Sequence, residues 1–220
     1  MQLSPDSPAA GRPSFDLSQD EIATVVDLLC CGSAEARQVV TGGMLEVPIT
    51  IQVKKAMRRL KRRLGLTNLQ IGGEFELLDV DDNDATVQGR IDVVFQFLHQ
   101  FGNEDAYLAV ECKRVSPDDN SLNRRYVTEG VSRFASEQYA SGHEWGMLLA
   151  YVLRLPAPDL VAGIDAHVRR QYGQASQLAP VEKHPDALEM HTSAVPRATS
   201  GHFIRLLHIF VDMTPAGENR

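Results

Sequence analysis

The chain of 220 residues has few cysteines and no long apolar run, and both absences narrow its class. Its three cysteines are Cys30, Cys31 and Cys112, with no Cys-x-x-Cys pair, so the sequence predicts neither a disulfide framework nor a thiolate zinc site. The longest apolar runs fall far short of the ~20 residues that span a bilayer. The first residues lack the basic and apolar regions of a signal peptide. We therefore expect a soluble, cytoplasmic protein without membrane contact.

The composition is that of an ordinary globular protein. Hydrophobic residues make up 43% of the chain and charged residues 23%, which argues against overall disorder. The length suits one domain with additions at its ends. Three prolines near the start predict a flexible leader over residues 1–15. A single domain over 16–215 and a short tail over 216–220 are expected to follow.

Positive charge is scarce except in one segment. The net charge is −7, yet residues 54–63 hold seven of the 22 basic residues and no acid, leaving 15 to balance 29 acids elsewhere. Such a concentrated patch can meet a polyanion. The candidate nucleic-acid contacts are Lys54, Lys55, Arg58, Arg59, Arg62 and Arg63. The alternative is an ordinary solvated helix face.

Apolar periodicity predicts an α/β protein. Val53, Met57, Leu60 and Leu64 form one helical stripe over about 48–64, and Gly65 is a C-terminal stop. Three sequential strands imply hairpins, and a helix before the fourth implies a crossover, so we expect a mixed sheet flanked by helices. The expected helices cover 16–31, 123–139 and 159–172, the strands 74–79, 90–98, 107–115, 145–153 and 203–213, and an exposed loop 174–187.

The chemistry concentrates on two of these strands. Glu111 and Lys113 are two residues apart and share one strand face, whereas Cys112 points to the core. Asp92 stands among apolar neighbours of the preceding strand, where an acid is costly unless it is paired or bound to a metal. A hairpin between the strands brings Asp92 to Glu111. Carboxylates suit Mg²⁺, and an adjacent lysine can stabilise charge that develops on a phosphate.

Each of these residues also has a simpler interpretation. Glu111 and Lys113 are typical of a solvated pair on an edge strand, and Asp92 is open to a salt bridge with Arg90. An acid at the start of a helix, such as Glu46, is favoured by the helix dipole alone. The histidines show no ligand spacing, and His191 and His208 are expected to be structural.

Asp92 followed by Glu111-x-Lys113 resembles the PD-(D/E)XK, or restriction-endonuclease-like, nuclease superfamily. The resemblance covers about 44–153 and implies a core of a helix, three strands, a helix and a strand, with 154–215 as an extension. It implies that Asp92 and Glu111 bind Mg²⁺, for which Mn²⁺ can substitute, and that Lys113 is catalytic. A glutamate on the first core helix often joins the site, and Glu46 is the candidate. The proline usual before the aspartate is replaced by Ile91.

The implied activity is hydrolysis of DNA phosphodiester bonds, with RNA left open, in prokaryotic restriction or anti-phage defence. Glu74 or Glu76 could replace Glu46, and Arg133 is a further candidate for phosphate contact. Because no specificity domain is evident, a homodimer or an activating or specificity partner protein is implied. Two alternatives stay open: a catalytically inactive DNA-binding or scaffolding member of the fold, and an α/β interaction domain with a basic docking helix.

Overall fold

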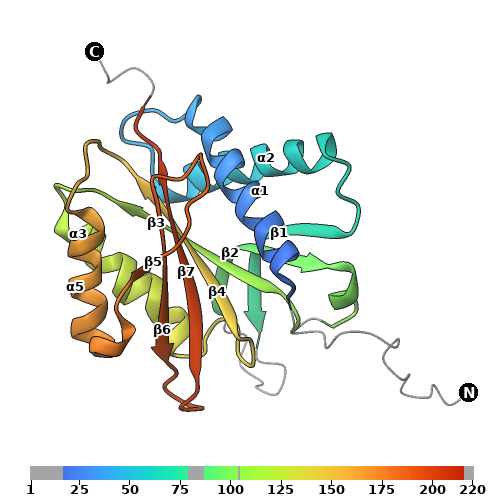
Figure 1. Ribbon diagram of the computed structural model, residues 1–220. Coiled ribbons are helices and arrows are strands. Elements are labelled where there is room, and N and C mark those ends of the chain that lie inside the picture. The colour runs from blue at the N-terminus through green and yellow to red at the C-terminus, as the bar shows by residue number, and fades with distance from the viewer. Residues whose placement is uncertain (1–16, 79–86, 104, 216–220) are drawn as a thin grey trace, which may run out of the picture.

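The computed structural model describes residues 17–78, 87–103 and 105–215. The expected leader and the expected tail lie outside these residues. The described chain is mixed α/β, with one seven-stranded sheet flanked by helices (Figure 1). None of the described helices is long and apolar enough to cross a membrane.

The sheet has the strand order β1-β2-β3-β4-β7-β6-β5. Antiparallel pairing joins β1 to β2 and β2 to β3, whereas β3, β4 and β7 run parallel, and β7, β6 and β5 are again antiparallel. The expected order of three hairpin strands, a helical crossover and a parallel strand is confirmed. The strands are β1 (Leu69–Leu78), β2 (Val87–Phe97), β3 (Leu108–Val115), β4 (Trp145–Val152), β5 (Ala179–Pro180), β6 (Glu189–Pro196) and β7 (Phe203–Asp212).

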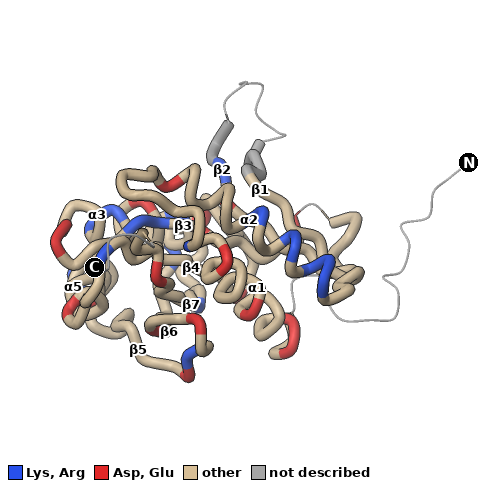
Figure 2. The backbone as a smooth tube through the Cα atoms, turned by 90° about the horizontal axis from the view of Figure 1, so that it is seen from above, with Lys and Arg blue, Asp and Glu red and all other residues tan. Residues whose placement is uncertain are grey.

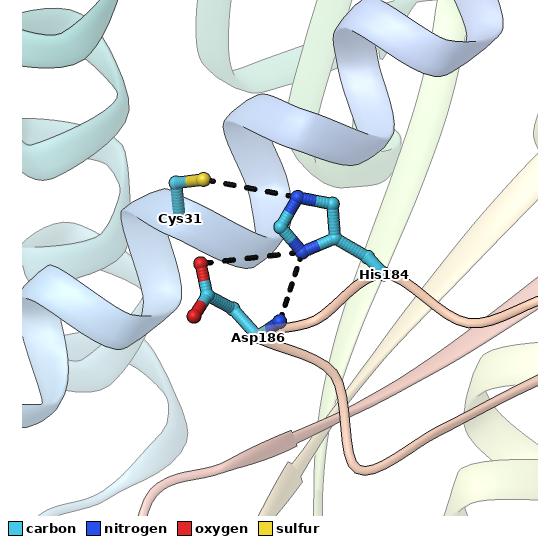
Figure 3. A group of neighbouring side chains, drawn as sticks. All are labelled: Cys31, His184 and Asp186. Atoms are coloured by element: carbon cyan, nitrogen blue, oxygen red, sulfur yellow. Dashed lines mark hydrogen bonds and ion pairs between the residues drawn. The ribbon is translucent and has the colours of Figure 1, made fainter.

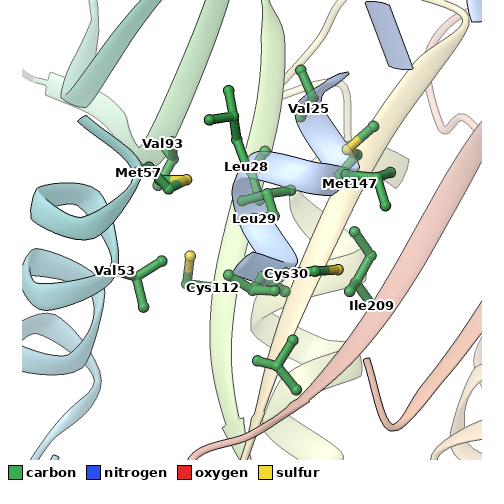
Figure 4. Packing of buried hydrophobic residues seen from close by; sticks show 14 of the residues in the cluster. Val25, Leu28, Leu29, Cys30, Val53, Met57, Val93, Cys112, Met147 and Ile209 are labelled. Atoms are coloured by element: carbon green, nitrogen blue, oxygen red, sulfur yellow. The ribbon is translucent and has the colours of Figure 1, made fainter. Parts of the chain in front are cut away.

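Helices cover both faces of the sheet (Figure 1). One face packs against α1 and α2 through a cluster that includes Leu29, Met57 and Cys112 (Figure 4), and the other face packs against the remaining helices. The helices of the first face are α1 (Gln19–Arg37) and α2 (Glu46–Arg63). Those of the second face are α3 (Asn120–Arg125), a π-helical turn η2 (Tyr126–Val131), α4 (Ser132–Ala135) and α5 (Leu160–Tyr172). Two short 3-10 turns are η1 (Leu98–Gln100) and η3 (Gln174–Ser176).

The ends of α1 and α2 follow from local sequence. Ser18 caps α1, since the Glu21 amide donates to its hydroxyl and its own amide donates to the Glu21 carboxylate. After α2, Gly65 has a φ of +66°, and the Leu66 amide donates back to the Lys61 carbonyl, which satisfies the last turn. Leu64, expected in the buried stripe, is exposed because it is the residue that ends the helix.

Three expectations about local structure were wrong. Period-two alternation along the expected strand 90–98 places Ile91 on one face with Val93 and Phe95, but Ile91 packs in the cluster on the α3–α5 face, beyond the point where the β2–β3 ladder ends. The single helix over 123–139 is divided by the π-helical turn. The strand β6 was not foreseen, since its polar and small residues lack a clear apolar alternation, and β5 lies within the expected loop 174–187.

A buried histidine on β7, His208, links the π-helical turn to β6 through hydrogen bonds. His208 is fully buried; its Nδ1 lies 2.8 Å from Tyr126 Oη and its Nε2 lies 2.8 Å from Ser193 Oγ. Burial, with a smaller effect of His191, lowers the pKa of His208 to about 3. His208 is therefore a neutral structural residue, in line with the sequence-based expectation.

The neutral state of His208 predicts a pH-dependent stability. In the unfolded chain a histidine takes up a proton near pH 6.5, whereas folded His208 stays neutral down to about pH 3. The free energy of unfolding should therefore fall by up to ~1.4 kcal/mol per pH unit as the pH drops from 6.5 towards 3. Urea unfolding of the wild type and of His208→Gln at several pH values checks this. Equal slopes in the two proteins would contradict it.

Candidate active site

The strand β3 carries two of the predicted site residues on one face. Glu111 is 4% exposed and Lys113 is 9% exposed, and both face the side covered by the π-helical turn, whereas Cys112 packs in the opposite cluster. The Lys113 Nζ lies 2.7 Å from the Glu111 Oε1. The pair is thus a buried ion pair within the sheet rather than a solvated pair on an edge strand, and β3 is an interior strand.

Glu46 reaches this pair from the first turn of α2. Its Oε1 accepts a hydrogen bond of 2.9 Å from the Lys113 Nζ, and its Oε2 accepts one of 3.0 Å from the Arg114 amide. The Glu46 carboxylate therefore binds β3 directly and does more than favour the helix dipole. The ammonium group of Lys113 stands between two carboxylates from different elements.

Asp92 lies where the β2–β3 ladder ends. The last paired residues are Val93 and Val110, and Asp92 and Glu111 are the next residues on the two strands. Beyond the ladder, the Asp92 Oδ2 accepts a 2.8 Å hydrogen bond from the Cys112 amide. The carboxylate replaces a backbone acceptor of β2, which fixes it beside β3.

The charges of these groups interact strongly. Burial is the largest cause that raises the pKa of Glu111 to about 8; the Asp92 charge also raises it, and Lys113 and Arg133 lower it. Burial also raises the pKa of Asp92, which Lys113 and Lys54 oppose. Burial alone would lower the pKa of Lys113, but Glu111, Glu46 and Asp92 raise it above its ordinary value. The nearby cations therefore offset the burial of Glu111 and Asp92 only in part.

One atom of the cluster lacks a partner. The Glu111 Oε2 is buried and has no hydrogen-bond partner among the described residues. A buried carboxylate oxygen without a donor carries its full cost of desolvation. The Lys113 ammonium binds the other oxygen, Oε1, and leaves Oε2 open, so the place next to this oxygen suits a further cation. The donor atoms there are hard oxygens, the ligand type that Mg²⁺ prefers, whereas softer metals favour nitrogen and sulfur ligands.

The π-helical turn covers the site closely because of a glycine. A Cβ at Gly130 would lie 3.1 Å from Leu148 Cδ2, 3.4 Å from Lys113 Cγ and 3.9 Å from Glu111 Cγ. Gly130 therefore lets the helix approach the two side chains, and π-helical turns of this kind frequently occur at functional sites. On the open side, a hollow of about 290 Å³ is lined by Glu46, Lys113 and Arg125, among others.

The basic residues of α2 differ in their surroundings. Arg58 donates to the Ile71 carbonyl, and Arg59 pairs with Glu35 at 2.7 Å, so both are engaged within the molecule. Lys55, Arg62 and Arg63 are exposed, and no partner of theirs is among the described side chains. Figure 2 shows the lysines and arginines of α2 as blue positions along the helix. Lys54 packs over Gly73 and lies near enough to Asp92 to lower its pKa.

The remaining predicted residues divide into two groups. Arg133 lies over the Tyr139 ring and binds Gln138, and its charge lowers the pKa of Glu111, so it belongs to the surroundings of the site. The side chains of Glu74 and Glu76 lie outside the described residues. Arg90 is exposed, and the described hydrogen-bond partner of Asp92 is the Cys112 amide.

A second cluster was missed from the sequence. Cys31, His184 and Asp186 place three potential ligand atoms within 4.8 Å of one another, an arrangement that could hold a metal ion. Cys31 and His184 are 153 positions apart. No local spacing could have indicated this group, because α1 and the segment before β6 meet only in the folded chain.

Comparisons of this chain with family models, with curated proteins and with solved structures found no match.

The link between Glu46 and Lys113 predicts a measurable coupling. In a double-mutant cycle of Glu46→Ala and Lys113→Met, we expect a coupling energy towards the upper part of the ~0.5–3 kcal/mol range found for contacting residues. Lys113→Met alone should lower stability by ~3–5 kcal/mol, because Glu111 would lose its buried partner. Denaturant unfolding of the four proteins supplies both values.

The exposed pair of Arg154 and Asp118 is a matched control. Their side chains are 71% and 57% exposed, and such pairs couple by less than ~1 kcal/mol. A coupling of Glu46 to Lys113 no larger than that of the control pair would contradict the inference that their contact orders the site.

Proposed function

We propose that this chain is a Mg²⁺-dependent nuclease of the restriction-endonuclease-like type that hydrolyses DNA phosphodiester bonds. The observation that carries the proposal is the unpartnered, buried Glu111 Oε2 beside Asp92, with Lys113 on the other oxygen of the same carboxylate. The order α2, β1, β2, β3, helical crossover, β4 supports it, since the resemblance implies that order. A role in restriction or anti-phage defence is part of the proposal by resemblance alone.

The donor set fits a small hard cation. Asp92 and Glu111 would hold it, with Glu46 as a third carboxylate close by. The bound ion supplies Lewis-acid stabilisation of a scissile phosphate and favours deprotonation of an attacking water. The Asp92 carboxylate is fixed by the Cys112 amide, so its position is set before any ion binds.

Lys113 has a separate task in this scheme. Its Nζ is held by Glu46, Glu111 and the Cys112 carbonyl at 2.9, 2.7 and 3.1 Å, and its raised pKa keeps it protonated at neutral pH. The three N–H donors of the ammonium are taken up by these acceptors, so its fixed positive charge at the edge of the hollow would act electrostatically on a phosphate oxygen whose charge grows in the transition state. Its contribution should therefore appear in the rate more than in binding.

The route of the substrate follows from charge. The hollow beside Glu46 and Lys113 opens next to Arg114 and Arg125, and the exposed cations of α2 lie on the helix that carries Glu46. A duplex or single strand that lies along α2 would bring a phosphate to this hollow. Phosphate contacts of this kind provide affinity without sequence specificity.

The kinetic prediction separates the two roles. Lys113→Met should still bind Mg²⁺ but, at saturating Mg²⁺, lower single-turnover cleavage of plasmid DNA by ~10²–10³, because it removes a positive charge that stabilises the transition state. Asp92→Asn should abolish both calorimetric Mg²⁺ binding and cleavage. Lys183→Met is the control, since Lys183 is an exposed lysine outside the site. A wild type that binds Mg²⁺ and cleaves no DNA or RNA would contradict the enzymatic proposal.

The binding prediction concerns the free cations of α2. Arg62→Ala with Arg63→Ala should reduce the slope of log affinity against log salt by up to ~1.8, because each lost phosphate contact removes ~0.9. Fluorescence anisotropy with labelled DNA at several salt concentrations measures the slope. Arg169→Ala with Arg170→Ala is the matched control, with the same charge change in the last turn of α5. Equal slopes in both double variants would exclude α2 as the DNA-binding surface.

A further inference from the structure

The cluster of Cys31, His184 and Asp186 joins two segments that are remote in sequence. Cys31 projects from α1, and the other two residues lie in residues 181–188, between β5 and β6 (Figure 3). The segment is anchored at both ends, since the Val181 amide donates to the Met190 carbonyl and the Leu188 amide to the Phe210 carbonyl. The side chains therefore face each other across a contact between two ordered elements.

The distances resemble those of a metal site without its ion. The Cys31 Sγ is 3.9 Å from the His184 Nε2, and an Asp27 oxygen, one turn before Cys31 on α1, is 3.4 Å from the same nitrogen. Tetrahedral zinc bonds of ordinary length place such neighbouring ligand atoms about 3.3–3.6 Å apart. The Asp186 Oδ2 lies 4.0 Å from the other ring nitrogen, Nδ1, so this carboxylate would have to turn towards Nε2 to complete the geometry.

The donor types determine the class of metal. A thiolate sulfur and an imidazole nitrogen favour zinc and related transition metals, whereas Mg²⁺ and Ca²⁺ prefer oxygen ligands alone. We propose that Cys31, His184 and Asp186 bind one zinc-class divalent cation, with Asp27 or water in the fourth position, and that this ion fastens the 181–188 segment to α1.

The same residue types also occur in nucleophilic triads, but the charges here oppose that use. A nucleophilic cysteine needs positive surroundings that stabilise its thiolate. Burial, followed by Asp186 and Asp27, raises the pKa of Cys31 to about 11. A divalent cation would compensate these negative groups, whereas a free thiolate would add to them.

Binding requires a defined change of protons. The Asp186 amide donates to the His184 Nδ1 at 3.0 Å, so the neutral ring carries its proton on Nε2. On coordination the Cys31 S–H bond breaks, the sulfur binds the ion and that proton goes to solvent. The ring proton moves from Nε2 to Nδ1, and the hydrogen bond from the Asp186 amide is lost. The net result is one proton released per ion from the thiol.

The full chain, freed of metal by chelation, can be titrated with Co²⁺ as the probe. We expect one equivalent to produce a sulfur-to-cobalt charge-transfer absorption, Zn²⁺ to displace it, and saturating Zn²⁺ to raise the melting temperature. Cys31→Ser should abolish the absorption. His184→Gln and Asp186→Asn should weaken binding by at least ~10–100-fold, the loss found even for outer partners of metal ligands.

Two controls make the result specific. His202→Gln replaces an exposed histidine outside the cluster and should bind Co²⁺ like the wild type. Asp92→Asn should keep the charge-transfer band, because Asp92 lies outside this cluster. The metal-site proposal and the nuclease proposal can therefore fail independently of each other. Circular dichroism verifies that each variant is folded. Absence of the band in the wild type, or its persistence in folded Cys31→Ser, would overturn the proposal.

Discussion

The ammonium of Lys113 is the point on which the arrangement of the candidate site depends. A buried charge is costly unless opposite charges surround it, and Lys113 meets this condition only because Glu111 lies on its own strand and Glu46 on α2. The first turn of α2 is therefore held against β3 by the same contacts that complete the site. The Arg114 amide, which donates to the second Glu46 oxygen, fixes that carboxylate in one orientation.

Other features of the fold serve this constraint. The β2–β3 ladder ends at Val93, next to Asp92. The Cys112 amide therefore has no backbone acceptor on β2 and donates to the Asp92 carboxylate instead. Gly130 admits the π-helical turn over Lys113, which removes water and strengthens every interaction beneath it. The result is a buried group of carboxylates whose direct ion-pair partner is the Lys113 ammonium. Apolar side chains of similar volume often stabilise a fold as well as or better than such a group, so stability alone does not explain it.

Sequence reasoning succeeded where short-range pattern determines structure. The period-two placement of Glu111 and Lys113, the apolar setting of Asp92 and the stripe of Val53, Met57 and Leu60 each depend on neighbours along the chain, and the expected pairing of strands followed from them. It failed where packing decides. The π-helical turn interrupts an otherwise helical pattern, and β6 forms because β7 is available as its partner, although its own sequence is weakly patterned.

The two metal-type clusters show how far this difference extends. Asp92, Glu111 and Lys113 belong to one hairpin, so a motif of about twenty residues contains most of the first site. Cys31 and His184 meet only after α1 has packed against the sheet and the 181–188 segment has been anchored by β6 and β7. A site of the second kind has no sequence signature in a single chain. Its donor atoms also differ, a thiol sulfur and an imidazole nitrogen beside a carboxylate rather than carboxylates alone, so the two proposed sites favour different metals. Selection between them would depend on coordination geometry and on which metal is available, because a zinc-class ion also binds oxygen donors.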